Sequence, residues 1–340
     1  MRVNLTAVKL TGVKLAAILA IFFFFAKKYY LCALKKFVEK MVTEFSQLFS
    51  LAQEAGKKKL SVACPYDSHT LCAVEKARKD SLIDAAFVGQ KSKIEKAALE
   101  SGISLDNYEV IDASDDDNAL EAAVRKVSSG RADILMKGLI SSERYLKAVL
   151  SRSSGLLTLD STISHIGIID NKNLGRLLIF GDAAVLPEPD FKQKLRILSS
   201  LVKMAKKLGN ENPKVALIAA TELVSMAIKA GHDAAIISKM SERGQLGCIV
   251  DGPLGLDVAI DKEASEIKEV KSVIKGDADC LIFPNIEAGN AFYKANTKIA
   301  NSLMASILAG VKCPVILTSR ADSIESKFYS ILLSLATGVI

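Results

Sequence analysis

The chain has 340 residues, half of them apolar, with seven prolines and no tryptophan. This is an ordinary globular composition, long enough for two domains with their own cores. The formal charge of +7 arises in residues 1–40, which hold eight of the 45 Lys and Arg and one of the 38 acids, so 37 of each sign remain in residues 41–340. Because nucleic-acid-binding proteins need a concentrated basic surface, this balance argues against a nucleic-acid partner.

The first forty residues contain an apolar run, residues 15–26, flanked by Lys14 and by Lys27 and Lys28. The run has twelve residues, fewer than the roughly 18–20 that span a bilayer. It can be a poor secretory signal, a helix lying on a membrane surface, or an extension foreign to the fold. We favour the third interpretation and expect residues 1–40 to lie outside the fold, with Met41 as the natural start.

Residues 41–340 alternate short apolar runs with amphipathic stretches, which predicts strands alternating with helices. We expect strands at residues 60–64, 85–89, 108–111, 132–138, 163–169, 177–180, 215–219, 248–250, 280–283 and 315–317. We expect helices at residues 43–55, 68–78, 91–101, 118–128, 141–155, 190–208, 233–242, 286–309 and 323–336. Asp67 and the acidic run 115–117 suit the positive end of a helix dipole, so they are interpreted as caps.

This alternation predicts an α/β protein with mostly parallel sheets that are covered by helices on both faces. About ten strands are more than a single sheet usually contains, so we expect two three-layer α/β/α domains with a cleft between them. A weak internal repeat supports this: residues 130–133 (GRAD) and 276–279 (GDAD) are similar in sequence, and each precedes an apolar strand. The first domain is expected to comprise residues 41–182 plus 318–340, and the second residues 183–317.

Several kinds of site are disfavoured by missing motifs. Six cysteines form no C-x-x-C pair, which suits reduced thiols in a cytoplasmic protein, and three histidines lack metal-ligand spacing. No G-x-G-x-x-G loop, Walker sequence or G-x-S-x-G elbow occurs. We therefore expect no metal site, no dinucleotide site and no P-loop.

Polar side chains follow the last predicted strand, at Thr318-Ser319-Arg320. Ligands of open α/β sheets collect outside the carboxyl ends of strands, and Arg320 offers a planar fork suited to a phosphate or an oxyanion. In the alternative interpretation Arg320 pairs with Asp322 or Glu325, and Ser319 is only a helix cap.

Other strand ends carry further candidates. Lys137 can bind a phosphate, with Gly138 allowing the backbone to come close to it, or Lys137 can be a solvated lysine after a strand. Asp251 can line a cleft or cap a turn. Asn285, Glu287 and Asn290 can form a polar wall of the cleft. Lys239 and Arg243, spaced i,i+4 on one helical face, can bind an anionic ligand or can be surface charges. Together these clusters describe an anion-rich cleft, and acyl transfer to or from phosphate fits it.

An ordered set of motifs resembles the phosphate acetyl/butyryltransferase family, most closely the phosphate butyryltransferases. The motifs cover residues 41–340 and are Ala132–Leu139, Ser164-His165, Asn212–Ala216, Ser238–Gln245, Asp251–Leu254, Phe283–Asn290 and Leu317–Ser323.

The resemblance implies an isocitrate/isopropylmalate dehydrogenase-like fold, a homodimer or larger oligomer, and the reaction acyl-CoA + phosphate ⇌ acyl phosphate + CoA. It implies no cofactor, with the coenzyme A thioester as substrate and a butyryl or branched acyl group preferred. Ser319 and Arg320 match the family's catalytic pair. In acetyl-specific relatives an Asp seven residues past that Ser accepts the thiol proton, but this position is Ser326 here. The base therefore stays open between Glu325 and Asp322.

Four alternatives remain. Two are enzymes of the same chemistry: a phosphate acetyltransferase, and an acyl-carrier-protein-dependent phosphate acyltransferase of lipid synthesis, for which the apolar N-terminus would be a membrane contact. The third is a non-catalytic CoA- or phosphate-binding sensor. The fourth is a related oxidoreductase, which should carry metal-binding aspartates and a nucleotide loop that the sequence does not show.

Overall fold

The structure, a computed structural model, describes residues 41–157 and 162–340. The expected extension over residues 1–40 lies outside the described residues. Within the described part no helix is both long enough and apolar enough to cross a membrane.

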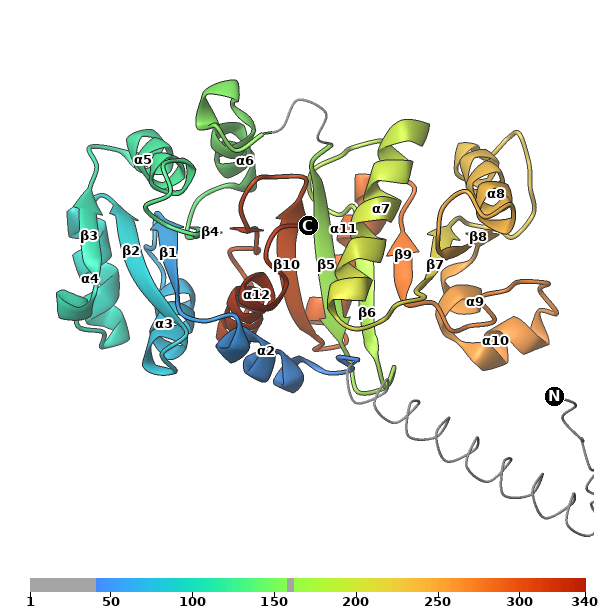
Figure 1. The fold of residues 1–340 in the computed structure, drawn as a ribbon, viewed down its shortest axis with the longest axis horizontal. Helices are drawn as coiled ribbons and strands as arrows, with labels where there is room; N and C mark the ends of the chain where they lie inside the picture. Colours follow the sequence, from blue (N-terminus) through green and yellow to red (C-terminus); the bar gives the residue numbers. More distant parts are fainter. Residues whose placement is uncertain (1–40, 158–161) are drawn as a thin grey trace, which may run out of the picture. The chain divides into compact units, whose positions relative to one another are not determined.

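One sheet of eleven strands organises residues 42–340, in the order β3-β2-β1-β4-β11-β10-β5-β6-β9-β7-β8, and Figure 1 shows it from β3 on the left to β8 on the right. The strands are β1 (Lys58–Ala63), β2 (Ile83–Gly89), β3 (Glu109–Asp112), β4 (Ile134–Lys137), β5 (Ser164–Asp170), β6 (Leu177–Gly181), β7 (Lys214–Ile218), β8 (Ile249–Leu254), β9 (Cys280–Ile282), β10 (Leu303–Ala309) and β11 (Val315–Ile316).

Strand direction changes in the middle of the sheet. The strands from β3 to β11 in the sheet order pair in parallel, and so do those from β6 to β8. The three pairings between these groups, β11–β10, β10–β5 and β5–β6, are antiparallel. The predicted α/β class with a mostly parallel sheet is therefore confirmed.

Helices cover both faces of the sheet. The helices are α2 (Leu48–Glu54), α3 (Ser68–Lys79), α4 (Lys91–Ser101), α5 (Asp116–Ser128), α6 (Ser142–Leu150), α7 (Phe191–Lys207), α8 (Lys229–Glu242), α9 (Leu256–Ile260), α10 (Lys262–Ile267), α11 (Ile286–Lys298) and α12 (Ile324–Thr337), with 3₁₀ turns at Phe45–Gln47, Leu105–Asn107 and Arg152–Ser154. Side chains of α2, α3, α4, α7, α8 and α12 share one continuous apolar cluster. Helices α5 and α6 bury theirs in a second cluster, and α9 and α11 in a third.

The predicted acidic caps are confirmed where the structure shows their hydrogen bonds. The Asp67 carboxylate accepts from the Thr70 N–H at the start of α3, and Asp115 accepts from the Asn118 N–H at the start of α5. Each satisfies one of the N–H groups that the first turn of a helix leaves without a partner.

The expected helix over residues 286–309 is wrong in its second half. Helix α11 ends at Lys298, and residues 303–309 form β10, which lies between β11 and β5. Nearly all of β10 is buried, so it reads as a continuous apolar run without the alternation of a half-exposed strand. Asn301, with φ +49°, adopts the left-handed conformation between the two elements.

The final segment returns to the elements at the start of the fold, because α12 packs against α2 and α3. Residues 42–340 group as one unit by their contacts. The partition into residues 41–182 plus 318–340 and residues 183–317 stays a prediction.

Candidate functional site

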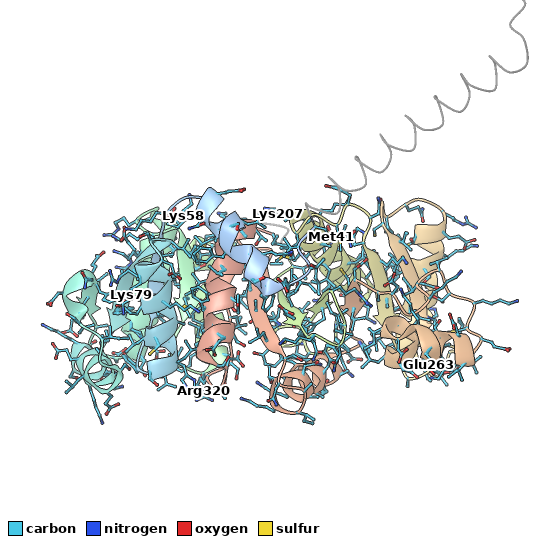
Figure 2. All side chains as sticks on the ribbon, turned by 90° about the horizontal axis from the view of Figure 1, so that it is seen from below. Met41, Lys58, Lys79, Lys207, Glu263 and Arg320 are labelled. Carbon is cyan, nitrogen blue, oxygen red and sulfur yellow. The ribbon has the colours of Figure 1, made fainter. Side chains whose placement is uncertain are left out.

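A cavity of about 150 Å³ opens between α6, α11 and the end of β11. It lies where the second and third apolar clusters meet, since its wall includes Leu317 and Ala184 of one and Ala183 and Tyr293 of the other. Arg320 of this wall lies on the side of the sheet opposite Lys207, the last residue of α7 (Figure 2). The cavity is lined by Ser142, His165, Ala183, Ala184, Asn290, Tyr293, Lys294, Leu317, Thr318, Ser319 and Arg320.

Asp322 fixes the backbone of the loop that carries Ser319 and Arg320. One oxygen of its buried carboxylate accepts from the Ser319 N–H at 2.7 Å and from the Tyr293 hydroxyl. Its peptide N–H donates to the Ser319 carbonyl at 3.2 Å, and its own carbonyl lies 3.0 Å from Nδ1 of His69. Hydrogen bonds to a charged carboxylate are among the stronger ones in proteins, so the loop is held in one geometry.

The alternative in which Ser319 caps the last helix is wrong. The N-cap of α12 is Ser323, whose hydroxyl accepts from the Ser326 N–H. Arg320 is exposed and, within the described residues, forms no ion pair within 4.0 Å with any carboxylate. Its guanidinium therefore remains available to an anion in the cavity that it lines.

Lys294 brings a second cation to Ser319. Its Nζ donates to the Ser319 hydroxyl oxygen at 3.1 Å. The accepted bond leaves the Ser319 O–H free to donate in another direction. Burial lowers the pKa of Lys294, while the Asp322 carboxylate acts against this and Lys298 adds to it. The cavity thus places a hydroxyl, an ammonium and a guanidinium around one small volume.

Two lysines lie fully buried near this loop. Lys137 donates to the carbonyls of Gly138 and Ile140, at 3.2 and 2.9 Å, and Lys327 donates to the Ser319 carbonyl at 3.3 Å. Burial lowers the pKa of Lys137 to about 7, with further lowering by Lys327 and Arg320. Lys137 is not part of the cavity wall. It holds the turn after β4, where a Cβ on Gly138 would lie 2.2 Å from the Cys64 carbonyl oxygen. The backbone of Gly138 therefore packs closely against that of Cys64, and the contact of Lys137 with a phosphate stays a prediction.

Four buried polar atoms in and beside the cavity have no hydrogen-bond partner in the part of the chain that the structure describes. Buried polar groups are nearly always paired in folded proteins, so a cluster of unpaired ones marks a place where a ligand or water completes the bonds. The atoms are Ser164 Oγ, His165 Nδ1, Thr318 Oγ1 and Asp322 Oδ1.

The polar wall predicted on the helix after β9 is only partly in place. Asn290 lines the cavity and donates to the Ala183 carbonyl at 3.1 Å. Asn285 is the N-cap of α11, where its side chain accepts from the Ala288 N–H. Glu287 is exposed in the first turn of that helix, and Glu325 is exposed in the first turn of α12. None of these last three is among the residues lining the cavity.

Lys239, Arg243 and Asp251 are not brought to this cavity. Lys239 and Asp251 line a separate hollow of about 760 Å³ between α8 and β8, where Lys239 pairs with Glu242 at 2.6 Å. Arg243 lines a neighbouring hollow of about 470 Å³. The Asp251 carboxylate accepts from the Ser272 hydroxyl at 2.7 Å.

Sequence reasoning missed His165, Tyr293, Lys294 and Thr318 as site residues. Tyr293 and Lys294 follow Asn290 by three and four residues on α11, so helical spacing places them on the face of that candidate. Thr318 directly precedes the predicted pair. His165 belongs to the Ser164-His165 motif of the family resemblance, but that motif gave it no role, and it comes from β5, about 150 residues earlier in the chain.

Comparisons with known proteins find relatives that match most of the chain. The family described as "Phosphate acetyl/butaryl transferase" matches residues 117–335. The chain is 40% identical over 295 residues to the phosphate butyryltransferase of Clostridium acetobutylicum, covering 86% of this chain and 98% of that protein. It is 39% identical over 299 residues to the phosphate acetyltransferase of Thermotoga maritima, covering 88% of this chain and 98% of that protein.

A solved structure with a similar fold is the branched-chain phosphotransacylase of Enterococcus faecalis V583. It matches with a TM-score of 0.72 and 29% identity, over 82% of this chain and 98% of that one. The family match spans more than half of the chain, and these relatives are matched over nearly their whole length. The chain therefore belongs to the phosphate acetyl/butyryl transferase family.

Proposed function

We propose that this chain is a phosphate acyltransferase that catalyses acyl-CoA + phosphate ⇌ acyl phosphate + CoA with short-chain acyl groups. The observation that carries the proposal is the cavity in which Ser319 accepts a hydrogen bond from Lys294 while Arg320 lies in the same wall without a carboxylate partner among the described residues. The family membership and the phosphate butyryltransferase relatives support it.

The roles of the site residues follow from their chemistry. Phosphate is a dianion near neutral pH, and Arg320 with Lys294 supplies two positive groups to hold it beside the thioester. The Ser319 hydroxyl is free to donate to the thioester carbonyl as negative charge develops there. Holding phosphate and thioester together removes the entropic cost of their encounter. We propose Ser319 and Arg320 as catalytic residues on this basis.

The small cavity supports a short acyl group. The cavity has a volume of about 150 Å³, which is room for small groups beside Ser319 and Arg320. The relatives are named for both butyryl and acetyl transfer. We propose butyryl or branched acyl groups as preferred substrates, acetyl as the alternative, and acyl-CoA rather than acyl-carrier protein as the donor. The reaction as written needs no electron acceptor, and we propose no resident cofactor.

The test measures thiol release with and without inorganic phosphate: CoA from acetyl-, butyryl-, isobutyryl- and octanoyl-CoA, and the free carrier-protein thiol from butyryl-acyl-carrier protein. We expect phosphate-dependent release that is fastest with butyryl- or isobutyryl-CoA and unchanged by EDTA. Thiol release that does not depend on phosphate with any donor would refute the proposed function. Faster release from the carrier protein would favour the lipid-synthesis alternative.

We further propose the two-part α/β/α organisation expected from the sequence, of the isocitrate/isopropylmalate dehydrogenase-like kind. It is supported by the reversal of strand direction across the middle of the sheet and by the separate apolar clusters under α5 and α6 and under α9 and α11. Residues 183–184 and 317–320, which line the cavity, adjoin the two expected boundaries.

We also propose a homo-oligomer in the cytoplasm. Strand β8 is the last strand in the sheet order, and exposed apolar side chains surround it, namely Val224, Ile236, Ile249 and Val273. Edge strands and apolar patches of this kind are usually covered in stable proteins. The five cysteines in the described part are unpaired, which suits a reducing compartment. Light scattering of the wild-type protein and of Ile249→Lys tests whether this edge is the interface.

A further inference from the structure

His165 is a buried histidine in the wall of the cavity, and the reaction outlined above gives it no role. Its side chain is 3% exposed, and the ring lies edge-on to Tyr293 with centroids 6.2 Å apart. Nδ1 has no hydrogen-bond partner in residues 41–157 and 162–340. Nδ1 is itself shielded from solvent, while other atoms of His165 line the cavity. Because buried polar atoms are nearly always paired, a ligand that enters beside the ring is a candidate partner for this nitrogen.

The surroundings of the ring keep it neutral. Burial lowers the pKa of His165, and Lys294 of α11 acts in the same direction. Three groups oppose this: the Asp182 carboxylate after β6, the nearby backbone of Leu317, and the Asp322 carboxylate. Tyr293 also faces the ring, but burial raises its pKa far above the neutral range, and Arg320 in the same wall is always charged.

The carboxylate beside the ring already has structural hydrogen bonds. Asp182 accepts from the His165 peptide N–H at 2.8 Å with one oxygen, and from the N–H groups of Ala184 and Val185 with the other. It therefore fixes the backbone of β5 against the loop after β6. This arrangement holds the ring at the cavity while leaving Nδ1 unoccupied.

The sequence offered Glu325 and Asp322 as acceptors of the thiol proton. Glu325 is exposed and does not line the cavity. Asp322 is outside the lining as well. Its Oδ1 is unpaired, but its Oδ2 is bonded to the Ser319 N–H and the Tyr293 hydroxyl, which gives this carboxylate a positioning role. His165 is the histidine of the cavity wall, and a neutral imidazole is the usual general base near pH 7.

We propose that His165 is the general base that accepts the CoA thiol proton, an inference that rests on the proposed acyltransferase function. In the direction that consumes acyl phosphate, the S–H proton passes to the ring as sulfur attacks the acyl carbon. The S–C bond forms, the C–O bond to phosphate breaks, and the ring proton passes to the departing phosphate. In the opposite direction, phosphate returns its proton to the ring, which protonates the leaving thiolate.

The kinetic test compares His165→Gln with the wild-type protein, using His232→Gln as the control. His232 is a half-exposed histidine at the distant hollow that Arg243 also lines. We expect kcat to fall at least about 100-fold in His165→Gln, the range for losing a general base, and to stay within twofold of wild type in His232→Gln. Because burial lowers the pKa of His165, kcat/KM of wild type should fall at acidic pH, below the ordinary histidine value of about 6.5. This loss of activity at acidic pH should be absent in His165→Gln.

A second measurement needs no substitution at His165. The chain contains three histidines, so ¹⁵N-histidine spectra of the full chain are simple, and His69→Gln and His232→Gln assign the other two. At pH 7 we expect a neutral His165 ring with Nδ1 unprotonated, and an Nδ1 resonance that shifts when CoA is added. A ring that is protonated at pH 7, or an Nδ1 resonance that CoA leaves unchanged, would overturn the proposal.

The outcomes separate this inference from the proposed function. If wild type shows no phosphate-dependent CoA release, the function fails and the inference fails with it. If wild type is active and His165→Gln keeps the wild-type kcat and the fall of kcat/KM at acidic pH, only the proposed role of His165 is refuted. If His165→Gln does not fold, the ¹⁵N spectra of the wild-type ring decide alone.

Discussion

Lys137 makes the stability of this protein depend on pH in a direction that can be calculated. Its ammonium is fully buried and contacts two carbonyls, and its pKa falls from 10.5 to about 7 on folding. Between these values the unfolded chain holds a proton that the folded chain has released. Stability therefore rises with pH across this window and is lost again as pH falls toward 7.

The size of the effect follows from the shift. Each unit of pKa difference corresponds to about 1.4 kcal/mol, so raising the pH from 7 to 10 should stabilise the folded state by up to roughly 4 kcal/mol through this one group. Lys137→Met removes the titrating group but keeps an unbranched chain of similar length. The difference in unfolding free energy between wild type and Lys137→Met should therefore grow in favour of wild type as the pH rises.

Urea denaturation at pH 6, 7, 8.5 and 10 measures this difference. The buried Lys327, whose pKa is also lowered by burial, is present in both proteins, so most of its contribution cancels. Lys312→Met is the matched control, because Lys312 also donates to a carbonyl, that of Gly155 at 3.1 Å, but from an exposed position. A difference between wild type and Lys137→Met that stays flat or shrinks from pH 7 to 10 would refute the reasoning.

Two further predictions concern the framework of the site. Gly138→Ala places a Cβ 2.2 Å from the Cys64 carbonyl oxygen and should destabilise by about 1–3 kcal/mol in urea melts. Gly231→Ala, on α8 with its nearest contact at 3.6 Å, should be neutral or stabilising, and equal effects of the two would contradict the clash. Asp322→Asn weakens the bonds to the Ser319 N–H and the Tyr293 hydroxyl, so kcat should fall at least tenfold. Asp322→Asn with wild-type turnover would show that this carboxylate does not position Ser319.

Local patterns were enough to predict most elements of the fold. Strands β1, β2 and β4 are apolar runs between amphipathic stretches, and the carboxylates of Asp67 and Asp115 cap the helices that follow. The short helices α9 and α10 were not predicted, and β10 was predicted as helix. Strand β10 is central and buried on both sides, and its Leu, Met and Ala content suits a helix equally well.

The site was predictable only where neighbours in sequence are neighbours in space. Ser319 and Arg320 follow one strand, and Asn290 was found at the helix after another. Lys239 lies within α8, Arg243 follows it, and Asp251 lies within β8. The position of β8 at the far edge of the sheet takes all three away from the cavity. Strand order is set by non-local packing, which residue spacing does not encode. For the same reason, residue spacing did not predict that His165 and Lys294 lie in the same cavity wall as Ser319.

The most direct test of the central claim is phosphate-dependent CoA release by wild type, Arg320→Gln and Arg243→Gln in the same assay. Arg320 lines the cavity beside Ser319, whereas Arg243 is an exposed arginine in the distant hollow. Loss of a group that stabilises transition-state charge typically costs about 10²–10³ in kcat. We predict such a loss in a folded Arg320→Gln and wild-type rates in Arg243→Gln. Near-normal turnover in Arg320→Gln, or an equal loss in both variants, would contradict the assignment of the cavity as the active site.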